Sequence, residues 1–300
     1  MQPTDQPLID RVIGCALPLA FLFCSSCATI EEPKSRTRLE RPWGFAAGAN
    51  DAEAQQLADV VEQVLATYQH LDGFRPQPLR AHMVDDHMGE PILGVAVAPA
   101  AGDPWIAVRR DNPDLQSTVA HELAHFYFRD AIASLPAMLQ EGVCDHLAIR
   151  VFGPSITQTR KLLFAATSYL DDFIIYVRGP SGRAALADLV EPAPSIHELF
   201  ALEIGLNEAL HLELDPATAA CMYGLGASIA DRVGFEGLME LVHRSDTAGH
   251  PEVPASWILD AAGLSPLTQD TLFELFTSVS YSNQSPGAQV FHVSLGTTKE

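Results

Sequence analysis

The chain has 300 residues and a formal net charge of −20, with 47% hydrophobic and 19% charged residues. This composition predicts a globular protein and excludes both a disordered chain and one that crosses a membrane many times. The strong negative charge repels phosphate backbones, so we expect no nucleic-acid partner.

The first 27 residues predict an export signal. Arg11 precedes a mostly apolar run from Val12 to Phe23, which spans roughly 18 Å as a helix and is too short for a hydrocarbon core of about 30 Å. The small pair Ser25-Ser26 before Cys27 resembles a bacterial lipobox, whose cysteine becomes lipidated after cleavage. We therefore expect export to a bacterial cell envelope, either lipid-anchored through Cys27 or periplasmic. An ordinary cleaved signal and an uncleaved anchor are the alternatives.

The next two segments predict a linker and a sheet-containing part. Residues 28–44 are charged and include Pro33 and Pro42, which is typical of a linker. Residues 45–152 begin with a helical period from Asp51 to Leu71. Three strands are predicted after it, at Leu79 to Val84, Pro91 to Ala98 and Trp105 to Arg109. Two helices follow, over about residues 112–129 and 137–152.

Residues 153–277 predict a mainly helical half, and residues 278–300 a polar C-terminal tail. Gly and Pro separate its helical segments, at Ile156 to Val177, Ser195 to Leu206, Pro216 to Val233 and Glu236 to His243. The predicted fold class is α+β: a small mixed sheet with helices, then a metal-bearing helix pair, then a helical C-terminal half. Cys144 and Cys221 could form a disulfide in an oxidising periplasm, and the sequence leaves this open.

The segment from Thr118 to His125 contains the pattern H-E-x-x-H. Residues four apart on a helix differ by only about 40° around its axis, so His121 and His125 project from one face and can hold one Zn²⁺. Glu122 lies on an adjoining face, where it can act as general base toward a water molecule. Short motifs recur by chance, so a surface helix with two unrelated histidines explains this pattern equally well.

The following helix offers a third ligand. Catalytic zinc usually has three protein ligands and one open position. If a short loop reverses the chain after about residue 129, Glu141 faces the two histidines, and Asp145 lies one turn further along the same face. There Asp145 can accept the free ring N–H of a zinc-binding histidine. Acidic residues are common on helix surfaces, but the shared phase of these two with the histidines favours a metal site.

H-E-L-A-H followed by L-P-x-x-L-x-E-G resembles the gluzincin zinc peptidases, particularly the peptidase MA-like group. The resemblance covers residues 118–148 and extends more loosely to about residue 243. It implies one zinc ion held by His121, His125 and Glu141, with Glu122 as the catalytic glutamate. Asp145 matches the carboxylate that thermolysin-like gluzincins carry one turn after their third ligand.

The resemblance also implies a substrate strand and an oxyanion donor. An edge strand before the metal helix binds the substrate backbone in this family, and the candidate residues are Trp105, Ile106, Ala107 and Val108. A plain core strand explains these residues equally well. Tyr223 at the start of a late helix and His211 are candidates for the donor that stabilises the oxyanion. A tyrosine that merely packs in a helical core would explain Tyr223 as well.

These features predict zinc-dependent hydrolysis of peptide bonds by a metal-activated water, in an exported and membrane-tethered protein. The expected partners are a peptide or protein substrate and, through the N-terminal lipid anchor, a membrane. The alternative is a catalytically weak or inactive peptide-binding or assembly lipoprotein of the same fold. A structural lipoprotein with a chance motif, which would bind no stoichiometric metal, is a third interpretation.

Overall fold

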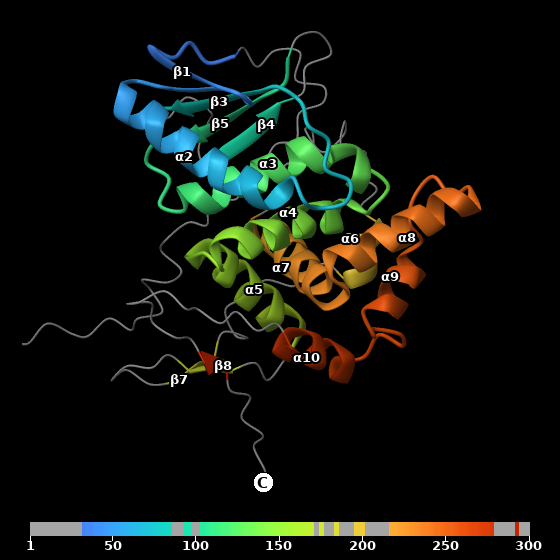
Figure 1. Cartoon of the computed structure of the whole chain (residues 1–300). Helices are drawn as coiled ribbons and strands as arrows, with labels where there is room; N and C mark the ends of the chain where they lie inside the picture. The colour runs from blue at the N-terminus through green and yellow to red at the C-terminus, as the bar shows by residue number, and fades with distance from the viewer. Residues whose placement is uncertain are drawn as a thin grey trace, which may run out of the picture.

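The computed structural model describes residues 32–85, 93–97, 103–170, 174–176, 183–185, 195–201, 216–278 and 292–293. These residues form a small mixed sheet that packs on helices and is followed by a helical C-terminal half (Figure 1), which confirms the predicted α+β class. The sheet has the order β1-β2-β3-β5-β4. Its strands are β1 (Thr37–Arg41), β2 (Gly44–Gly48), β3 (Leu79–Val84), β4 (Gly94–Val97) and β5 (Trp105–Arg109).

The strands β2, β3 and β5 run parallel, and antiparallel β1 and β4 form the two edges of the sheet. Helices α2 (Asp51–Tyr68) and α3 (Leu115–Ile132) pack against each other and against the sheet. Side chains alternate across β5, as the strand period requires. Ile106 and Val108 join the main core with these helices, whereas Trp105 and Ala107 belong to a second buried cluster with Val95 and Val97.

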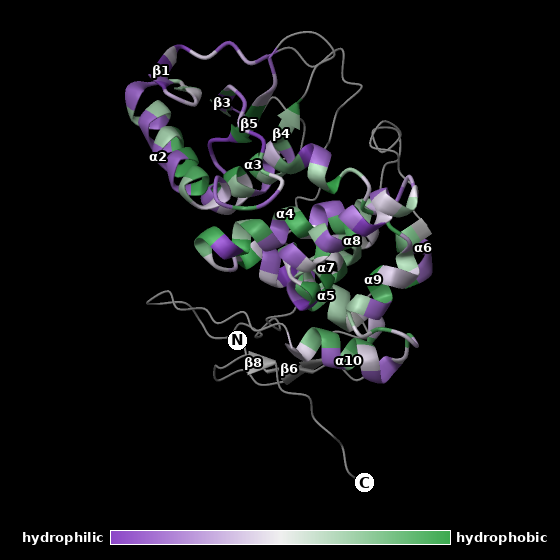
Figure 2. Ribbon diagram, turned by 45° about the vertical axis from the view of Figure 1, so that its right-hand side comes forward, coloured by the Kyte–Doolittle hydropathy of each residue, from purple (hydrophilic) through white to green (hydrophobic). Residues whose placement is uncertain are grey.

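The remaining helices form the C-terminal half. They are α4 (Ala137–Phe152), α5 (Ile156–Tyr169), α6 (Ile196–Ala201), α7 (Pro216–Val233), α8 (Phe235–Ala248), α9 (Ala255–Ala261) and α10 (Gln269–Ser278). Helix α4 packs between α3 and α7, and α5 packs along α7. Figure 2 shows hydrophilic and hydrophobic residues alternating around α2, the pattern of a helix with one face on the core. A second sheet has the order β7-β6-β8, with β6 (Ile174–Tyr176), β7 (Arg183–Ala185) and β8 (His292–Val293).

The prediction of a linker over residues 28–44 is wrong at residues 37–41, which form the edge strand β1. Leu39 is the only apolar residue of this strand, because an edge strand with exposed side chains needs little hydrophobic pattern. The strand pairs with β2 across the turn at Pro42 and Trp43, and Arg41 also forms an ion pair with Glu62 on α2 at 2.9 Å. The helix predicted from Ile156 to Val177 ends earlier, at Tyr169, because Leu170 takes an extended backbone conformation.

Cys144 and Cys221 are both buried as thiols, so the disulfide considered from the sequence is not formed between them. Among the helices of the described residues, none combines the length and the apolarity needed to cross a membrane. The predicted signal segment, including Cys27, lies outside the described residues, as does most of the predicted C-terminal tail.

Candidate metal centre

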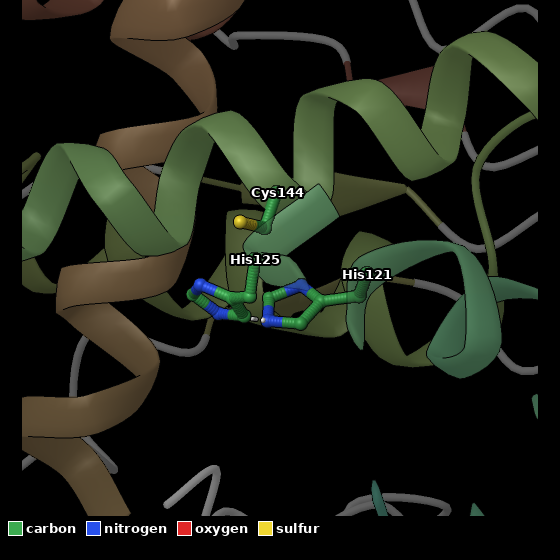
Figure 3. A group of neighbouring side chains, drawn as sticks. All are labelled: His121, His125 and Cys144. Atoms are coloured by element: carbon green, nitrogen blue, oxygen red, sulfur yellow. Dashed lines mark hydrogen bonds between the residues drawn. The ribbon is translucent and has the colours of Figure 1, made fainter. Parts of the chain in front are cut away.

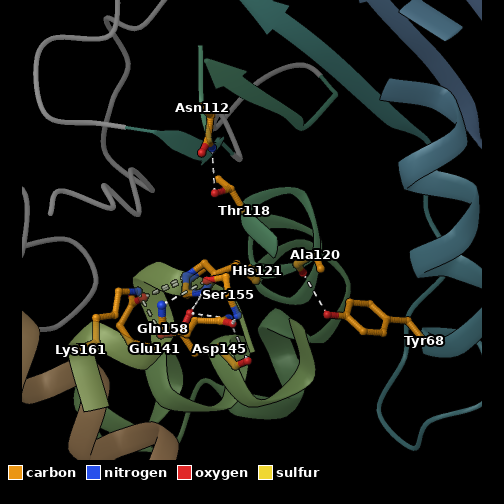
Figure 4. Close-up of polar contacts among 11 residues, drawn as sticks. Tyr68, Asn112, Thr118, Ala120, His121, Glu141, Asp145, Ser155, Gln158 and Lys161 are labelled. Carbon is orange, nitrogen blue, oxygen red and sulfur yellow. Dashed lines mark hydrogen bonds and ion pairs between the residues drawn. The ribbon is translucent and has the colours of Figure 1, made fainter. Parts of the chain in front are cut away.

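The H-E-x-x-H segment lies in the middle of α3, where buried hydrogen bonds hold the helix on both sides (Figure 4). Tyr68 at the end of α2 donates its hydroxyl to the carbonyl oxygen of Ala120, 3.0 Å away. Asn112 Nδ2, in the loop before α3, donates to Thr118 Oγ1 at 2.8 Å. Because both bonds are buried, they fix the part of α3 that carries the two histidines.

A short reversal after α3 brings α4 back along it, as the sequence predicted. The buried side chain of Gln140 stabilises this loop by donating from Nε2 to the carbonyl oxygen of Leu135 at 2.7 Å. On its other side α4 lies close to α7, because Gly142 and Gly226 meet at the crossing. A Cβ atom on Gly142 would collide with the backbone of Gly226. Glu141 is therefore held between α3 and α7.

Three donor atoms from α3 and α4 converge at this point. The Nε2 atoms of His121 and His125 are 3.1 Å apart, and each is 3.2 Å from Oε2 of Glu141. The three atoms thus form a nearly equilateral triangle. Metal–ligand bonds of about 2.0–2.1 Å at tetrahedral angles place ligand atoms roughly 3.3 Å apart. The triangle therefore fits a small divalent cation with a fourth position left to another ligand.

Cys144 is a further ligating side chain near the histidines. Its Sγ and the ring nitrogens of His121 and His125 lie within 4.8 Å of one another, and this buried group could hold a metal ion (Figure 3). Glu141 is better placed, because its oxygen is only 3.2 Å from both rings. Burial, together with the charges of Glu141 and Glu122, raises the pKa of the Cys144 thiol well above its usual range in the metal-free site.

Asp145 and Lys161 extend the site beyond the histidines (Figure 4). Nδ1 of His121 is 2.9 Å from Oδ1 of Asp145, so a proton on Nδ1 leaves Nε2 directed at His125 and Glu141. Lys161 Nζ donates to the other carboxylate oxygen, Oδ2, at 2.9 Å. Burial alone would raise the pKa of Asp145, but the charges of Lys161 and His121 lower it to about 2. Asp145 is therefore an ionised acceptor at neutral pH.

The two histidines have opposite pKa shifts. Burial would lower the pKa of His121, but its hydrogen bonds and charge interactions with Asp145 and Glu141 raise it to about 9. For His125, burial outweighs the attraction of Glu141 and lowers the pKa. The carboxyl of Glu141 responds to both rings: despite its burial, its pKa lies well below the usual range. At neutral pH the metal-free cluster thus holds one ionised carboxylate, one protonated imidazole and one neutral imidazole, and loss of the proton from His121 gives a donor set that zinc prefers.

Glu122 lies beside the triangle without joining it. Its side chain is only 2% exposed, and no hydrogen-bond partner for Oε1 is found among the described residues. Burial raises the pKa of Glu122 to about 8. Strand β4 approaches at Gly94, where a Cβ atom would press against the side chains of Thr118 and Glu122. A buried carboxylate oxygen without a partner is costly, which indicates a ligand or a water at this position.

Tyr223 on α7 also reaches the site. Its ring centroid is 6.0 Å from that of His121. Burial, followed by the charges of Glu141 and Asp145, raises the pKa of Tyr223 well above its usual range, so the hydroxyl remains a donor. Gly224 lets α7 pack closely on α5, because a Cβ atom there would collide with the backbone carbonyl of Lys161. The other candidate donor, His211, lies outside the described residues.

The prediction that the strand of Trp105 to Val108 is an edge that binds substrate is wrong. This strand is β5, whose two sides pair with β3 and β4, so its backbone cannot accept another strand. The edge nearest α3 is β4. A cavity of about 440 Å³ lies where β4 ends, lined by Ala96 and Val97 on the strand and by His125 and Arg129 on α3.

Sequence reasoning missed Lys161, Gln158, Gln140 and Gly94. Their contacts join segments whose relative placement no local pattern indicates. The chain has only three lysines, and this rarity could have drawn attention to Lys161, although it does not indicate which residues Lys161 contacts.

In comparisons with known proteins, no family model and no curated protein matches this chain.

Proposed function

We propose that this protein is a zinc-dependent peptidase of the gluzincin type, with one Zn²⁺ per chain held by His121, His125 and Glu141. The observation that carries the proposal is the triangle of Nε2, Nε2 and Oε2 atoms with sides of 3.1–3.2 Å. Two imidazoles, one carboxylate and one open position form a common donor set of catalytic zinc. The unpartnered Oε1 of Glu122 beside that set supports hydrolysis.

Bound zinc would supply Lewis acidity to a water molecule and to the carbonyl oxygen of a peptide bond. Glu122 Oε1 would take a proton from the attacking water and pass it to the nitrogen of the leaving amine. The hydroxyl of Tyr223, which hydrogen-bonds the Glu141 carboxylate in the metal-free site, would leave that carboxylate to donate to the developing oxyanion. Asp145 would keep the ring of His121 in the tautomer that presents Nε2. Each of these roles falls on a side chain within the buried cluster.

A peptide substrate would add a strand to the edge of β4 that pairs with no strand among the described residues. One face of such a strand would lie against α3, and its side chains would enter the cavity of about 440 Å³ beside His125. The N-terminal sequence supports action outside the cytoplasm, with the chain tethered to a membrane through a lipid on Cys27 or released into the periplasm. The negative charge of the chain supports a protein or peptide substrate in preference to nucleic acid.

Metal analysis of purified protein tests the ligand set. We expect about one zinc per chain in the wild type and in Cys144→Ala, and little in His125→Ala and Glu141→Ala. Loss of zinc in Cys144→Ala with retention in Glu141→Ala would show instead that cysteine is the third ligand. Incubation of the zinc-loaded protein with a mixed peptide library, read by mass spectrometry, then tests hydrolysis.

A peptide-binding or assembly lipoprotein without useful turnover is the second candidate. Burial raises the pKa of the Glu122 carboxyl to about 8, so this group serves as a base at neutral pH only when a nearby charge lowers its pKa. A cation within about 4–6 Å would lower this pKa and restore the base. Zinc-loaded protein that retains peptides from the library but cleaves none between pH 6 and 9 would establish the binding function.

A further inference from the structure

We propose that Lys161 is a positioning residue of the metal centre, acting through Asp145 on His121 and through Tyr223 on Glu141. This inference rests on the proposed zinc site. Lys161 lies on α5, which contributes no metal ligand, and its side chain is only 2% exposed. Its ammonium nitrogen lies 2.9 Å from Oδ2 of Asp145 and 4.0 Å from the ring centroid of Tyr223.

A stabilising role alone does not explain a lysine at this position. Burying an ammonium group is costly, and well-packed apolar side chains often stabilise a core as well as a buried ion pair does. The surrounding core of α4, α5 and α7 is apolar, and lysine occurs only three times in the chain. The charge is therefore better explained by the two groups that it contacts.

The first contact acts on His121. Asp145 uses its two oxygens on opposite sides: Oδ1 faces Nδ1 of His121 at 2.9 Å, and Oδ2 faces Lys161. The amide of Gln158, one turn before Lys161 on α5, lies 3.4 Å from Oδ1. With both oxygens engaged, the carboxylate cannot rotate away from the imidazole. Lys161 thus fixes the plane and the tautomer of the ring that directs Nε2 at the metal position.

The second contact acts on Glu141. The ammonium of Lys161 lies over the ring of Tyr223, a favourable cation–π arrangement. The hydroxyl of Tyr223 in turn forms a hydrogen bond to the carboxylate of Glu141. Gly224 brings the backbone of α7 against that of Lys161 and makes this arrangement compact. The ammonium of Lys161 therefore contacts both Asp145 and Tyr223, which in turn hold His121 on α3 and Glu141 on α4.

Lys161→Met tests the inference, because methionine keeps the apolar stem and removes the charge. Arg160→Met is the matched control, since Arg160 is the exposed neighbour on the same helix. We expect the zinc affinity, measured by chelator competition, to fall roughly 10–100-fold in Lys161→Met, the usual cost of losing a partner of a metal ligand. The control should match the wild type.

The visible spectrum of a cobalt(II)-substituted sample reports directly on the ligand geometry, and it would not change if Lys161 only stabilised the fold. We expect the visible bands of cobalt to shift in Lys161→Met and to stay unchanged in Arg160→Met. If Lys161→Met does not fold, Lys161→Gln, which keeps a donor for Asp145, takes its place with a smaller loss expected. In the background of Asp145→Asn, removal of the lysine should weaken zinc binding less than in the wild type.

A folded lysine variant with the zinc affinity and cobalt spectrum of the wild type would overturn the inference. The inference would also be overturned if the double variant of Asp145→Asn and Lys161→Met lost zinc affinity by the full product of the two single losses. These readouts need no turnover, so zinc-binding protein that cleaves no peptide would refute the proposed function and leave this inference standing. A wild type without stoichiometric metal would overturn both.

Discussion

Glu122 follows His121 on α3 and takes no part in the donor triangle, so its replacement tests hydrolysis separately from metal binding. Its Oε1 is buried without a partner among the described residues, whereas the three proposed ligands contact one another. Replacement by glutamine keeps the shape of the side chain and removes the proton acceptor. We expect zinc-loaded Glu122→Gln to hold as much zinc as the wild type and to lose at least about a hundredfold in peptidase activity.

Zinc analysis together with kcat/KM on a cleaved peptide checks this expectation. The matched control is Glu240→Gln, because Glu240 is exposed on α8. This control should leave both quantities unchanged. Hydrolysis by Glu122→Gln at the wild-type rate would assign the general base to another group.

The pKa of His121 predicts how the zinc affinity depends on pH. Despite burial, Asp145 and Glu141 raise the pKa of His121 to about 9, so in the metal-free protein this ring holds a proton at neutral pH. A metal must displace that proton from Nε2. The zinc affinity should therefore be highest above about pH 9 and fall roughly tenfold for each pH unit below it. Chelator competition between pH 6 and 10 measures this slope, and an affinity independent of pH would contradict it.

At the scale of elements, the crossing of α4 and α7 determines where Glu141 lies. Gly226 on α7 lies against the backbone of Met138 and Gly142 on α4, and a Cβ atom at position 226 would collide with the Met138 carbonyl. Gly226→Ala must push the helices apart. We expect a loss of about 1–3 kcal/mol in the free energy of unfolding, and weaker zinc binding because Glu141 moves with α4.

Chemical denaturation and chelator competition measure the two effects. Gly237→Ala on α8 is the control, because its added Cβ atom would meet only the side chain of Val233, at 3.1 Å. The better helix propensity of alanine should leave this variant as stable as the wild type or slightly more stable. Equal stability of the two alanine variants would refute a strict requirement for glycine at the crossing.

At the scale of the whole molecule, the N-terminal segment predicts where the folded part resides. If Cys27 receives a lipid, the full-length chain expressed in a bacterium should fractionate with membranes, and Cys27→Ala should release it or block processing. Fractionation with immunoblotting and a labelled fatty acid measures both effects. Membrane association of Cys27→Ala at the wild-type level, without acylation, would favour an uncleaved anchor instead.

Local sequence patterns were sufficient to predict the helices that carry the site. The helices predicted at 137–152 and 216–233 have the same bounds in the structure. The spacing of His121, His125, Glu141 and Asp145 was sufficient to place all four side chains on facing surfaces. These predictions succeed because helical phase depends only on neighbours within a few residues along the chain.

Only the tertiary structure decided which strand is the edge. Strand β4 precedes β5 in the chain yet pairs outside it, so the edge beside α3 belongs to Gly94–Val97. Strand β1 likewise shows no strong local pattern and becomes a strand through its pairing with β2. The contacts of Lys161 with Asp145 and Tyr223 require the packing of α5 against α4 and α7. Strand order and helix packing depend on contacts between residues far apart in sequence, which no local periodicity encodes.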